Sequence, residues 1–172
     1  VRAANGVILI KTKSGKKEAP LTVEYNAYGG FQQTTRKIPV LNASEYGAIV
    51  NEAYAAGGNA IPFNNLASLG VGTDWQDLVF ENAPIINQDV SIRGGGKKST
   101  YSYSGSYLTQ DGIVGGDKSN FTRYTNTANY SLEFLEDFKV NAGLTFLKTN
   151  KRNLPENSNS SVLFNAINMA PT

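Results

Sequence analysis

Apolar and polar residues alternate along several stretches of this chain. The clearest is residues 99–108, where Tyr101 and Tyr103 alternate with Ser102 and Ser104. Because successive side chains of a β-strand point to opposite faces, this pattern predicts one aromatic face and one polar face. The same alternation predicts five strands in all, over residues 21–32, 85–93, 99–108, 121–132 and 138–148.

These predicted strands are long, since a strand in a soluble protein usually has about five or six residues. About 9–11 residues are needed to cross a bilayer as a tilted strand. The connections also differ in length: residues 94–98 and 133–137 predict tight turns, residues 109–120 a medium loop, and residues 33–84 a long loop. Short turns at one end and longer loops at the other are typical of membrane barrels. The pattern therefore predicts an all-β fold, an antiparallel transmembrane β-barrel segment.

Short helices are predicted inside the long connections. Asn42 followed three residues later by Glu45 is a capping pair, and apolar residues then recur at helical spacing until two glycines end them. Thr73 and Gln76 repeat the capping-box spacing ahead of a second short helix. A third helix is predicted within residues 160–170, with its apolar residues on one side. The outer loops should therefore carry helices of their own.

Composition excludes several classes of site. The chain has no Cys and no His, so it has no disulfides, no thiolate metal site and no histidine-based catalytic triad. Its 16 basic and 14 acidic residues nearly cancel, which argues against a nucleic acid held by phosphate neutralisation. We therefore predict no cofactor, no metal and no nucleic-acid partner.

Carboxylates are the remaining candidates for catalysis. Asp74 and Asp77 form one pair, and Glu133, Glu136 and Asp137 form a second cluster in a predicted turn. Glycoside hydrolysis requires two carboxyl groups about 5–9 Å apart across a cleft. Acidic residues in a tight turn are usually solvated, so the chain is predicted not to be an enzyme.

Six segments in order resemble the SusC/RagA-type TonB-dependent outer-membrane transporters. The opening "RAANGVILIKTKSGK" resembles the end of the plug domain of that family, and "LTVEYNAYGGFQ" resembles its first barrel strand. "LNASEYGAIVNEA" is similar to the helix of the first outer loop. "TDWQDLVFENAPIINQDVSIRGGGKKSTYSYSGSYLTQDGIV", "NFTRYTNTANYSLEF" and "FKVNAGLTFLKTNKRN" are similar to the strands that follow.

The resemblance implies a domain organisation and a function. Residues 1–19 would be the end of the plug domain and its linker, with the last plug strand at 7–13, and residues 20–172 the N-terminal part of the barrel with its outer loops. The parent protein would import a glycan, oligosaccharide or peptide across the outer membrane of a Gram-negative bacterium. Its partners would be the TonB complex (through parts absent here), a SusD-like surface lipoprotein and outer-membrane lipid.

Two groups of side chains are candidate contacts. The predicted outer-loop contacts to ligand or partner are Tyr46, Tyr54, Asp74, Trp75 and Asp77. The predicted lipid-interface aromatics are Tyr101, Tyr103, Tyr107, Tyr130, Phe138 and Phe146. Two alternatives stay open: the tyrosines could be a platform for stacking sugars, and Trp75 could instead anchor the small core of its own loop.

A second reading of the whole chain is a soluble β-sandwich that binds carbohydrate or acts as an adhesin. The two readings differ in the surroundings of the aromatic face. In a sandwich, that face packs against a second sheet in the core. In a membrane barrel, it faces lipid and no second sheet covers it.

Overall fold

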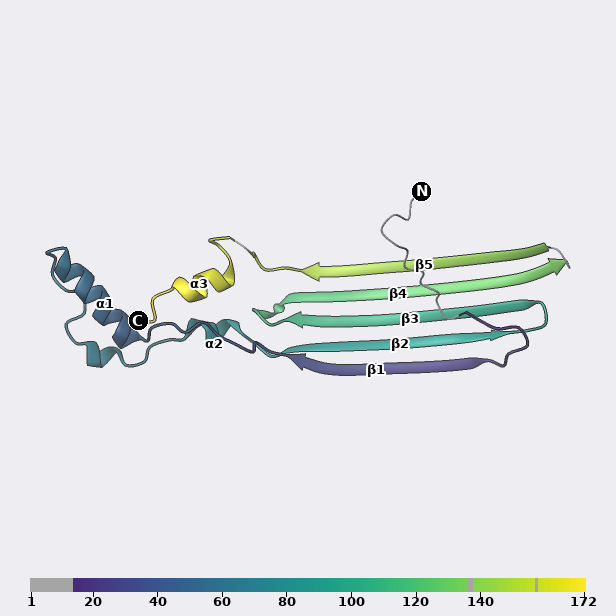
Figure 1. The fold of residues 1–172 in the computed structure, drawn as a ribbon, viewed down its shortest axis with the longest axis horizontal. Coiled ribbons are helices and arrows are strands. Elements are labelled where there is room, and N and C mark those ends of the chain that lie inside the picture. The colour runs from purple at the N-terminus through teal and green to yellow at the C-terminus, as the bar shows by residue number, and fades with distance from the viewer. Residues whose placement is uncertain (1–13, 136–137, 157) are drawn as a thin grey trace, which may run out of the picture. The chain divides into compact units, whose positions relative to one another are not determined.

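The computed structural model describes residues 14–135, 138–156 and 158–172 (Figure 1). In chain order the elements are β1 (Thr22–Gln32), α1 (Ala43–Ala56), the 3-10 helix η1 (Leu66–Leu69), α2 (Trp75–Val79), β2 (Ala83–Gly95), β3 (Ser99–Gly112), β4 (Gly116–Leu135), β5 (Phe138–Arg152) and α3 (Val162–Asn168). The predicted plug strand at 7–13 lies outside the described residues.

The five predicted strands are confirmed. They form one sheet in the order β1-β2-β3-β4-β5, and the arrows in Figure 1 alternate in direction, so the sheet is antiparallel. Each strand pairs with the strand that follows it in the sequence. This all-β arrangement, with short helices only in the connections, agrees with the predicted fold class.

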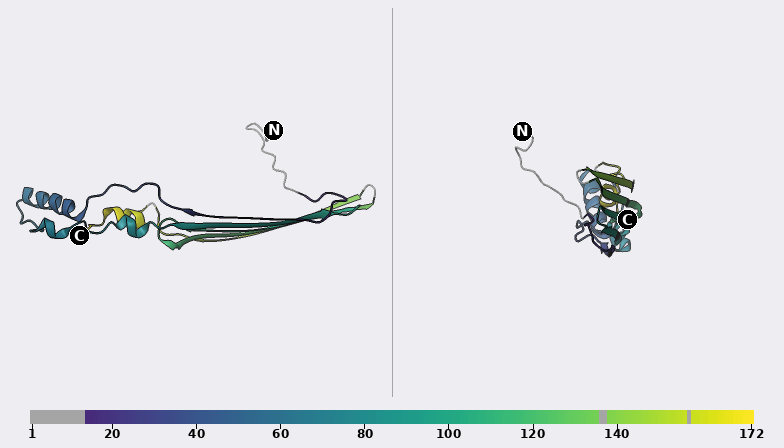
Figure 2. Two further views of the ribbon diagram at one scale, coloured as in Figure 1. Left: turned by 90° about the horizontal axis from the view of Figure 1, so that it is seen from below. Right: turned by 90° about the vertical axis from the view of Figure 1, so that its right-hand side faces the viewer.

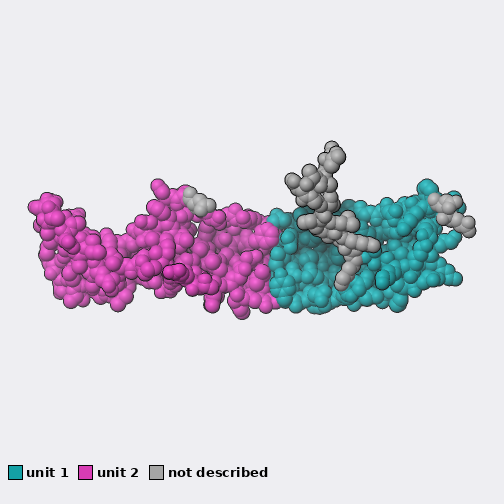
Figure 3. Space-filling model, in the orientation of Figure 1, with its two compact units in different colours: residues 1–28, 86–108, 123–149 teal, residues 29–85, 109–122, 150–172 magenta. Residues whose placement is uncertain are grey.

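The chain divides into two compact units, which are coloured separately in Figure 3. Unit 1 consists of residues 1–28, 86–108 and 123–149. Unit 2 consists of residues 29–85, 109–122 and 150–172. Unit 1 therefore contains the linker and much of the strands, whereas unit 2 contains all of the helices described.

The strands of unit 1 form a single layer, which Figure 2 shows edge-on. A β-sandwich requires a second sheet packed on the first. The described residues form one sheet and supply no such second layer. Within the described part of the chain, the aromatic rows of unit 1 are therefore not covered by a second sheet.

The connection between β3 and β4 differs from the prediction. A medium loop was expected over residues 109–120, but β3 continues to Gly112 and β4 begins at Gly116. Gly115 and Gly116 have φ values of 71° and 52°, in the left-handed region that glycine adopts without a steric penalty. These two residues allow a tight turn where the polar composition indicated a loop.

Two other boundaries are corrected. β5 extends to Arg152, beyond the predicted strand end at residue 148. Glu133 lies within β4 rather than in a turn. Residues 136 and 137 of the same predicted turn lie outside the described part of the chain. The tight turn predicted at 94–98 is confirmed, because β2 ends at Gly95 and β3 begins at Ser99.

In unit 2 the first helix has the predicted cap. The Asn42 side chain accepts a hydrogen bond from the Glu45 backbone N–H, and the Glu45 carboxylate accepts one from the Asn42 N–H, both at 2.9 Å. This reciprocal capping box satisfies two backbone donors at the start of α1. Gly47 is buried against Leu66 and Leu69, so α1 packs on η1.

The caps of the two shorter helices correct the predictions. The N-cap of α2 is Asp74, not Thr73: its carboxylate accepts from the Gln76 backbone N–H at 2.9 Å, because Asp is the better cap. The third helix is shorter than residues 160–170. Ser161 caps it, Asn168 is its last residue, and the backbone is extended at Met169. None of the helices in the described residues is both long and apolar enough to cross a membrane.

Candidate functional site

One face of the sheet in unit 1 is polar and is linked by side-chain contacts between strands. The Arg93 guanidinium of β2 donates to the Glu24 carboxylate of β1 through both terminal nitrogens, with Nη1 and Oε2 3.0 Å apart. The hydroxyl groups of Thr127 and Thr145 join β4 to β5 at 3.4 Å. A bidentate Arg–carboxylate pair is strong and directional, and it holds two neighbouring strands in register.

The linker that leads into β1 lies against the turn end of these strands. The Glu18 N–H donates to the Gly96 carbonyl and the Gly95 N–H donates to the Ala19 carbonyl, each at 3.1 Å. Lys17 forms an ion pair with Glu133, whose side chain belongs to the polar face of β4. The chain therefore enters the sheet from its polar side.

The opposite face carries the predicted lipid-interface aromatics. Contacts between strands show the shared face: the rings of Tyr107 and Tyr124 lie 5.0 Å apart, and the Tyr103 hydroxyl donates to the Asn126 side chain at 2.7 Å. The face carries Val23, Tyr25, Ile86, Val90, Tyr101, Tyr103, Tyr107, Tyr130, Phe138, Val140, Leu144 and Phe146. Leu144 is 71% exposed and Phe146 is 56% exposed. Exposed apolar surface of this kind is typical of a region that contacts a partner or a membrane.

Two polar side chains on the apolar face, Gln88 and Asn126, have tyrosine partners. The Tyr25 hydroxyl donates to the Gln88 side-chain oxygen at 3.4 Å, and Asn126 accepts from Tyr103. A polar group in an apolar medium costs free energy unless it is hydrogen-bonded. These two pairings let the apolar face carry two amide side chains, which the alternation alone did not explain.

In unit 2 the two candidate carboxylates of the second loop helix are brought together by a lysine. Lys37 forms an ion pair with Asp77, and its ammonium nitrogen lies 3.9 Å from the Asp74 carboxylate. The hydrogen bond and the charge of Lys37 lower the pKa of the Asp77 carboxyl below its usual value. Asp77 is therefore ionised and paired, and Asp74 caps α2. Neither is arranged as a proton donor.

The most completely buried polar side chain among the described residues was not among the predicted contact residues. Gln76 is 1% exposed, and its amide bonds both backbone groups of Ile38: the oxygen accepts from the Ile38 N–H at 3.0 Å, and the nitrogen donates to the Ile38 carbonyl at 2.7 Å. The side chain thus pairs with the backbone of the loop segment 34–41 in the way that a neighbouring strand would. With the Lys37 ion pairs, it holds this segment on α2.

Replacing Gln76 by alanine should loosen that segment. The two Ile38 backbone groups would lose their partners, and each lost hydrogen bond costs about 0.5–1.5 kcal/mol because Ile38 is half exposed to water. We expect hydrogen exchange at the Ile38 amide of the full-length protein to become about tenfold faster or more, since 1.4 kcal/mol corresponds to a factor of ten. Gln33→Ala, at an exposed position, is the control. Equal exchange rates in both variants would contradict the role of Gln76.

The predicted aromatic contacts of the loops lie in two places. Tyr46 and Trp75 line one hollow of about 440 Å³, together with Met169 and Pro171 from the C-terminal segment. We call this the Trp75 hollow. The Trp75 indole N–H donates to the Ala170 carbonyl at 2.8 Å, so Trp75 joins the loop between β1 and β2 to the segment that follows α3. Tyr54, near the end of α1, is not among the residues that line the Trp75 hollow. Ligand contact by Tyr46, Tyr54 and Trp75 stays a prediction.

Comparison with known proteins gives several related sequences, although no protein-family model matches the chain. It is 40% identical over 145 residues to the TonB-dependent receptor SusC of Bacteroides thetaiotaomicron, a match that covers 82% of this chain and 14% of that protein. It is 35% identical over 139 residues to the TonB-dependent receptor P3 of Formosa agariphila, covering 81% of this chain and 13% of the relative. The chain thus spans about one seventh of the length of these relatives.

Solved structures show the same fold. The chain superimposes on the RagAB peptide transporter with a TM-score of 0.79 at 23% identity, covering 99% of this chain and 22% of that one. A structure of the RagAB peptide importer in the open-open state gives a TM-score of 0.69 at 26% identity, with 88% and 20% of the two chains covered. This chain therefore has the same fold as the corresponding part of each of these two structures.

Proposed function

The chain belongs to the SusC/RagA type of TonB-dependent receptors, and from this premise we propose that its parent protein imports a bulky nutrient across the outer membrane of a Gram-negative bacterium. The nutrient is a glycan, an oligosaccharide or a peptide. The observation that carries the proposal is the two-faced sheet of unit 1, in which the aromatic and aliphatic face is exposed and the polar face carries ion pairs.

Each part of the segment has a place in this proposal. The apolar face of the strands contacts membrane lipid, with tyrosines and phenylalanines at the lipid interface. The polar face lines the interior of the barrel. Residues 1–19 are the end of a plug domain and its linker, and residues 20–172 begin the barrel wall. The entry of the linker on the polar side supports this assignment, because a plug fills the interior of the barrel.

The partners follow from the same premise. The TonB complex acts through parts of the protein outside this chain. A SusD-like lipoprotein covers the outer loops, within residues 33–82 and 153–172.

Two measurements on the full-length protein test the transport proposal. It should be found in the outer-membrane fraction, and cells should take up labelled oligopeptides or oligosaccharides only when TonB is functional. Uptake that is independent of TonB would contradict it.

Removing α1 tests the role of the first outer loop. Replacing residues 43–56 by a Gly/Ser linker of equal length should impair nutrient uptake or co-purification of the lipoprotein. The barrel should still assemble, because the packing partner of α1 is the neighbouring η1 in the same loop. Assembly is measured by the heat-dependent gel mobility of the protein. Normal uptake together with normal lipoprotein co-purification would contradict the assignment.

A further inference from the structure

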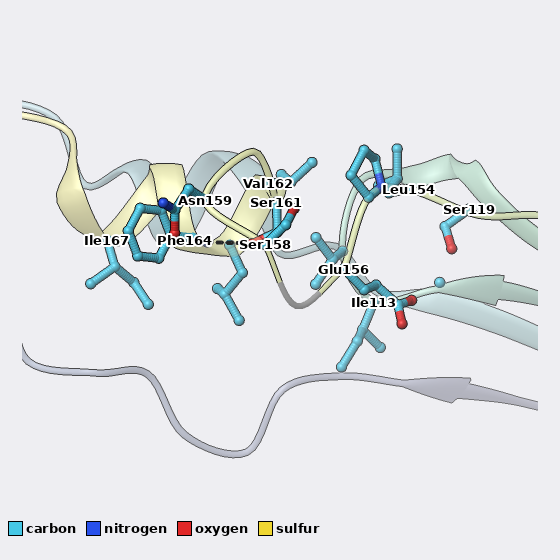
Figure 4. Close-up of a pocket in the computed structure, with 14 residues that line it drawn as sticks. Ile113, Ser119, Leu154, Glu156, Ser158, Asn159, Ser161, Val162, Phe164 and Ile167 are labelled. Atoms are coloured by element: carbon cyan, nitrogen blue, oxygen red, sulfur yellow. Dashed lines mark hydrogen bonds between the residues drawn. The ribbon is translucent and has the colours of Figure 1, made fainter.

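Unit 2 contains a second and larger hollow beside α3. Its volume is about 680 Å³, within the range of about 300–1,000 Å³ that is usual for ligand sites. Three parts of the chain surround it: the turn between β3 and β4, residues 154–156 with 158–161, and α3 (Figure 4). We call it the α3 hollow. None of the predicted site residues lines it.

The lining of the α3 hollow is mainly apolar. Figure 4 shows Phe164 and Ile167 of α3 on one side and Ile113 with Glu156 on the other. Phe164 is 44% exposed, so its ring keeps apolar surface that a ligand can cover. Burial of such surface is the usual source of binding energy in ligand sites.

The charge of the α3 hollow comes from a single side chain. Among the described residues that line it, Glu156 is the one with a formal charge, and its side chain is exposed. Ser119, Ser158 and Asn159 add neutral polar groups at the edge. An apolar wall beside one carboxylate is complementary to a ligand that carries an apolar group next to a positive charge.

The walls of the α3 hollow are held in place by local contacts. Ser161 caps α3 by accepting from the Phe164 N–H at 3.2 Å, and the Asn165 side chain donates to the Ser161 carbonyl at 2.9 Å. On the other side, a Cβ added at Gly115 would lie 2.6 Å from the Leu154 Cδ1 atom. Leu154 therefore packs directly on the turn between the strands. A hollow with supported walls meets a ligand at a lower entropic cost.

We propose that the α3 hollow binds the amino-terminal end of a hydrophobic peptide, with Glu156 pairing with the free ammonium group and Phe164 and Ile167 contacting the apolar side chains. This inference rests on the proposed function and makes it more specific, because it selects one ligand class. A neutral sugar fits this lining less well. Its many hydroxyl groups would lose water against apolar side chains without gaining hydrogen bonds.

Isothermal titration of the full-length receptor in detergent tests this site. The probes are tri-leucine with a free amino terminus, N-acetylated tri-leucine and maltotriose. We expect the free peptide to bind, and both acetylation of the peptide and Glu156→Gln to weaken its binding by about tenfold or more, which corresponds to about 1.4 kcal/mol. The acetylated peptide should be insensitive to Glu156→Gln, since the pair is already broken.

Two further variants complete the test. Phe164→Ala should weaken both peptides alike, and Glu52→Gln, an exposed carboxylate on α1, should change nothing. The inference is overturned if the free peptide does not bind, if Glu156→Gln leaves its affinity unchanged, or if maltotriose binds instead and responds to Phe164→Ala. TonB-dependent uptake by intact cells is measured in parallel. If uptake persists, the transport proposal stands although the site fails, whereas loss of TonB dependence counts against transport itself.

Discussion

Leu144→Lys should prevent most of the full-length receptor from assembling in the membrane, whereas Thr145→Lys should leave assembly close to normal. The two residues are neighbours on β5, so they lie at almost the same depth in the sheet. Leu144 belongs to the apolar face and is 71% exposed. Thr145 belongs to the polar face, where its hydroxyl contacts Thr127.

The two variants should differ in assembly because the two faces of the sheet contact different media. A lysine on the lipid face of a barrel costs about 2–4 kcal/mol near the middle of the bilayer, whereas a position facing the interior remains in contact with water. The fraction of protein with heat-dependent gel mobility in outer-membrane preparations measures assembly. Equal assembly of the two variants would mean that the apolar face does not meet lipid, and the transport proposal would lose its main support.

The second large effect is expected at Gly72, where three segments of unit 2 meet. Its φ is 73°, and an added Cβ would overlap the Pro171 carbonyl oxygen and the Ala43 Cβ. The adjacent Thr73 N–H donates to the same Pro171 carbonyl at 2.9 Å. Gly72→Ala therefore combines a left-handed backbone with a clash against backbone atoms. We expect a loss of about 3–5 kcal/mol in the local stability of the loop.

A second glycine serves as a control that separates the penalty of the left-handed backbone from the steric clash. Gly58 has a φ of 72°, but an added Cβ there would meet no atom within 4 Å. Gly58→Ala should therefore cost only about 1–2 kcal/mol, the penalty of the left-handed conformation. Hydrogen exchange at the Thr73 amide of the full-length receptor reports the opening of this junction. It should accelerate about a hundredfold or more in Gly72→Ala and remain unchanged in Gly58→Ala. Unchanged exchange in both variants would refute the steric argument.

The two faces of the sheet could be predicted from the sequence because they depend on local information. A strand places alternate residues on opposite sides wherever it lies in a protein. The pattern around Tyr101, Tyr103 and Leu144 was therefore sufficient to assign each face. Capping is equally local, and the Asn42–Glu45 pair was confirmed.

The extent of the strands was harder to predict. Thr109 and Asp111 interrupt the aromatic alternation, and a polar sequence of this kind predicts a loop. In the structure the backbone pairing continues through these polar residues, and the Asn120 side chain donates to both of their side chains. Polar strand ends and loops have the same composition, and only the pairing of the backbone distinguishes them.

The sites in unit 2 depended on contacts between distant parts of the chain. The Thr73–Gln76 spacing predicts a capping box, but the Gln76 side chain instead pairs with Ile38. The α3 hollow combines the turn after β3 with residues more than 40 positions later in the sequence, such as Glu156. No spacing rule links such segments, because the fold of the intervening chain decides which of them meet.

The strand order has a consequence for work with this segment in isolation. β1 and β5 are the outermost strands of the sheet, so each has a neighbour on one side among the described residues. The backbone N–H and C=O groups on the other side of such a strand can recruit a strand from another molecule. A preparation of these 172 residues by themselves is expected to polymerise through these edges.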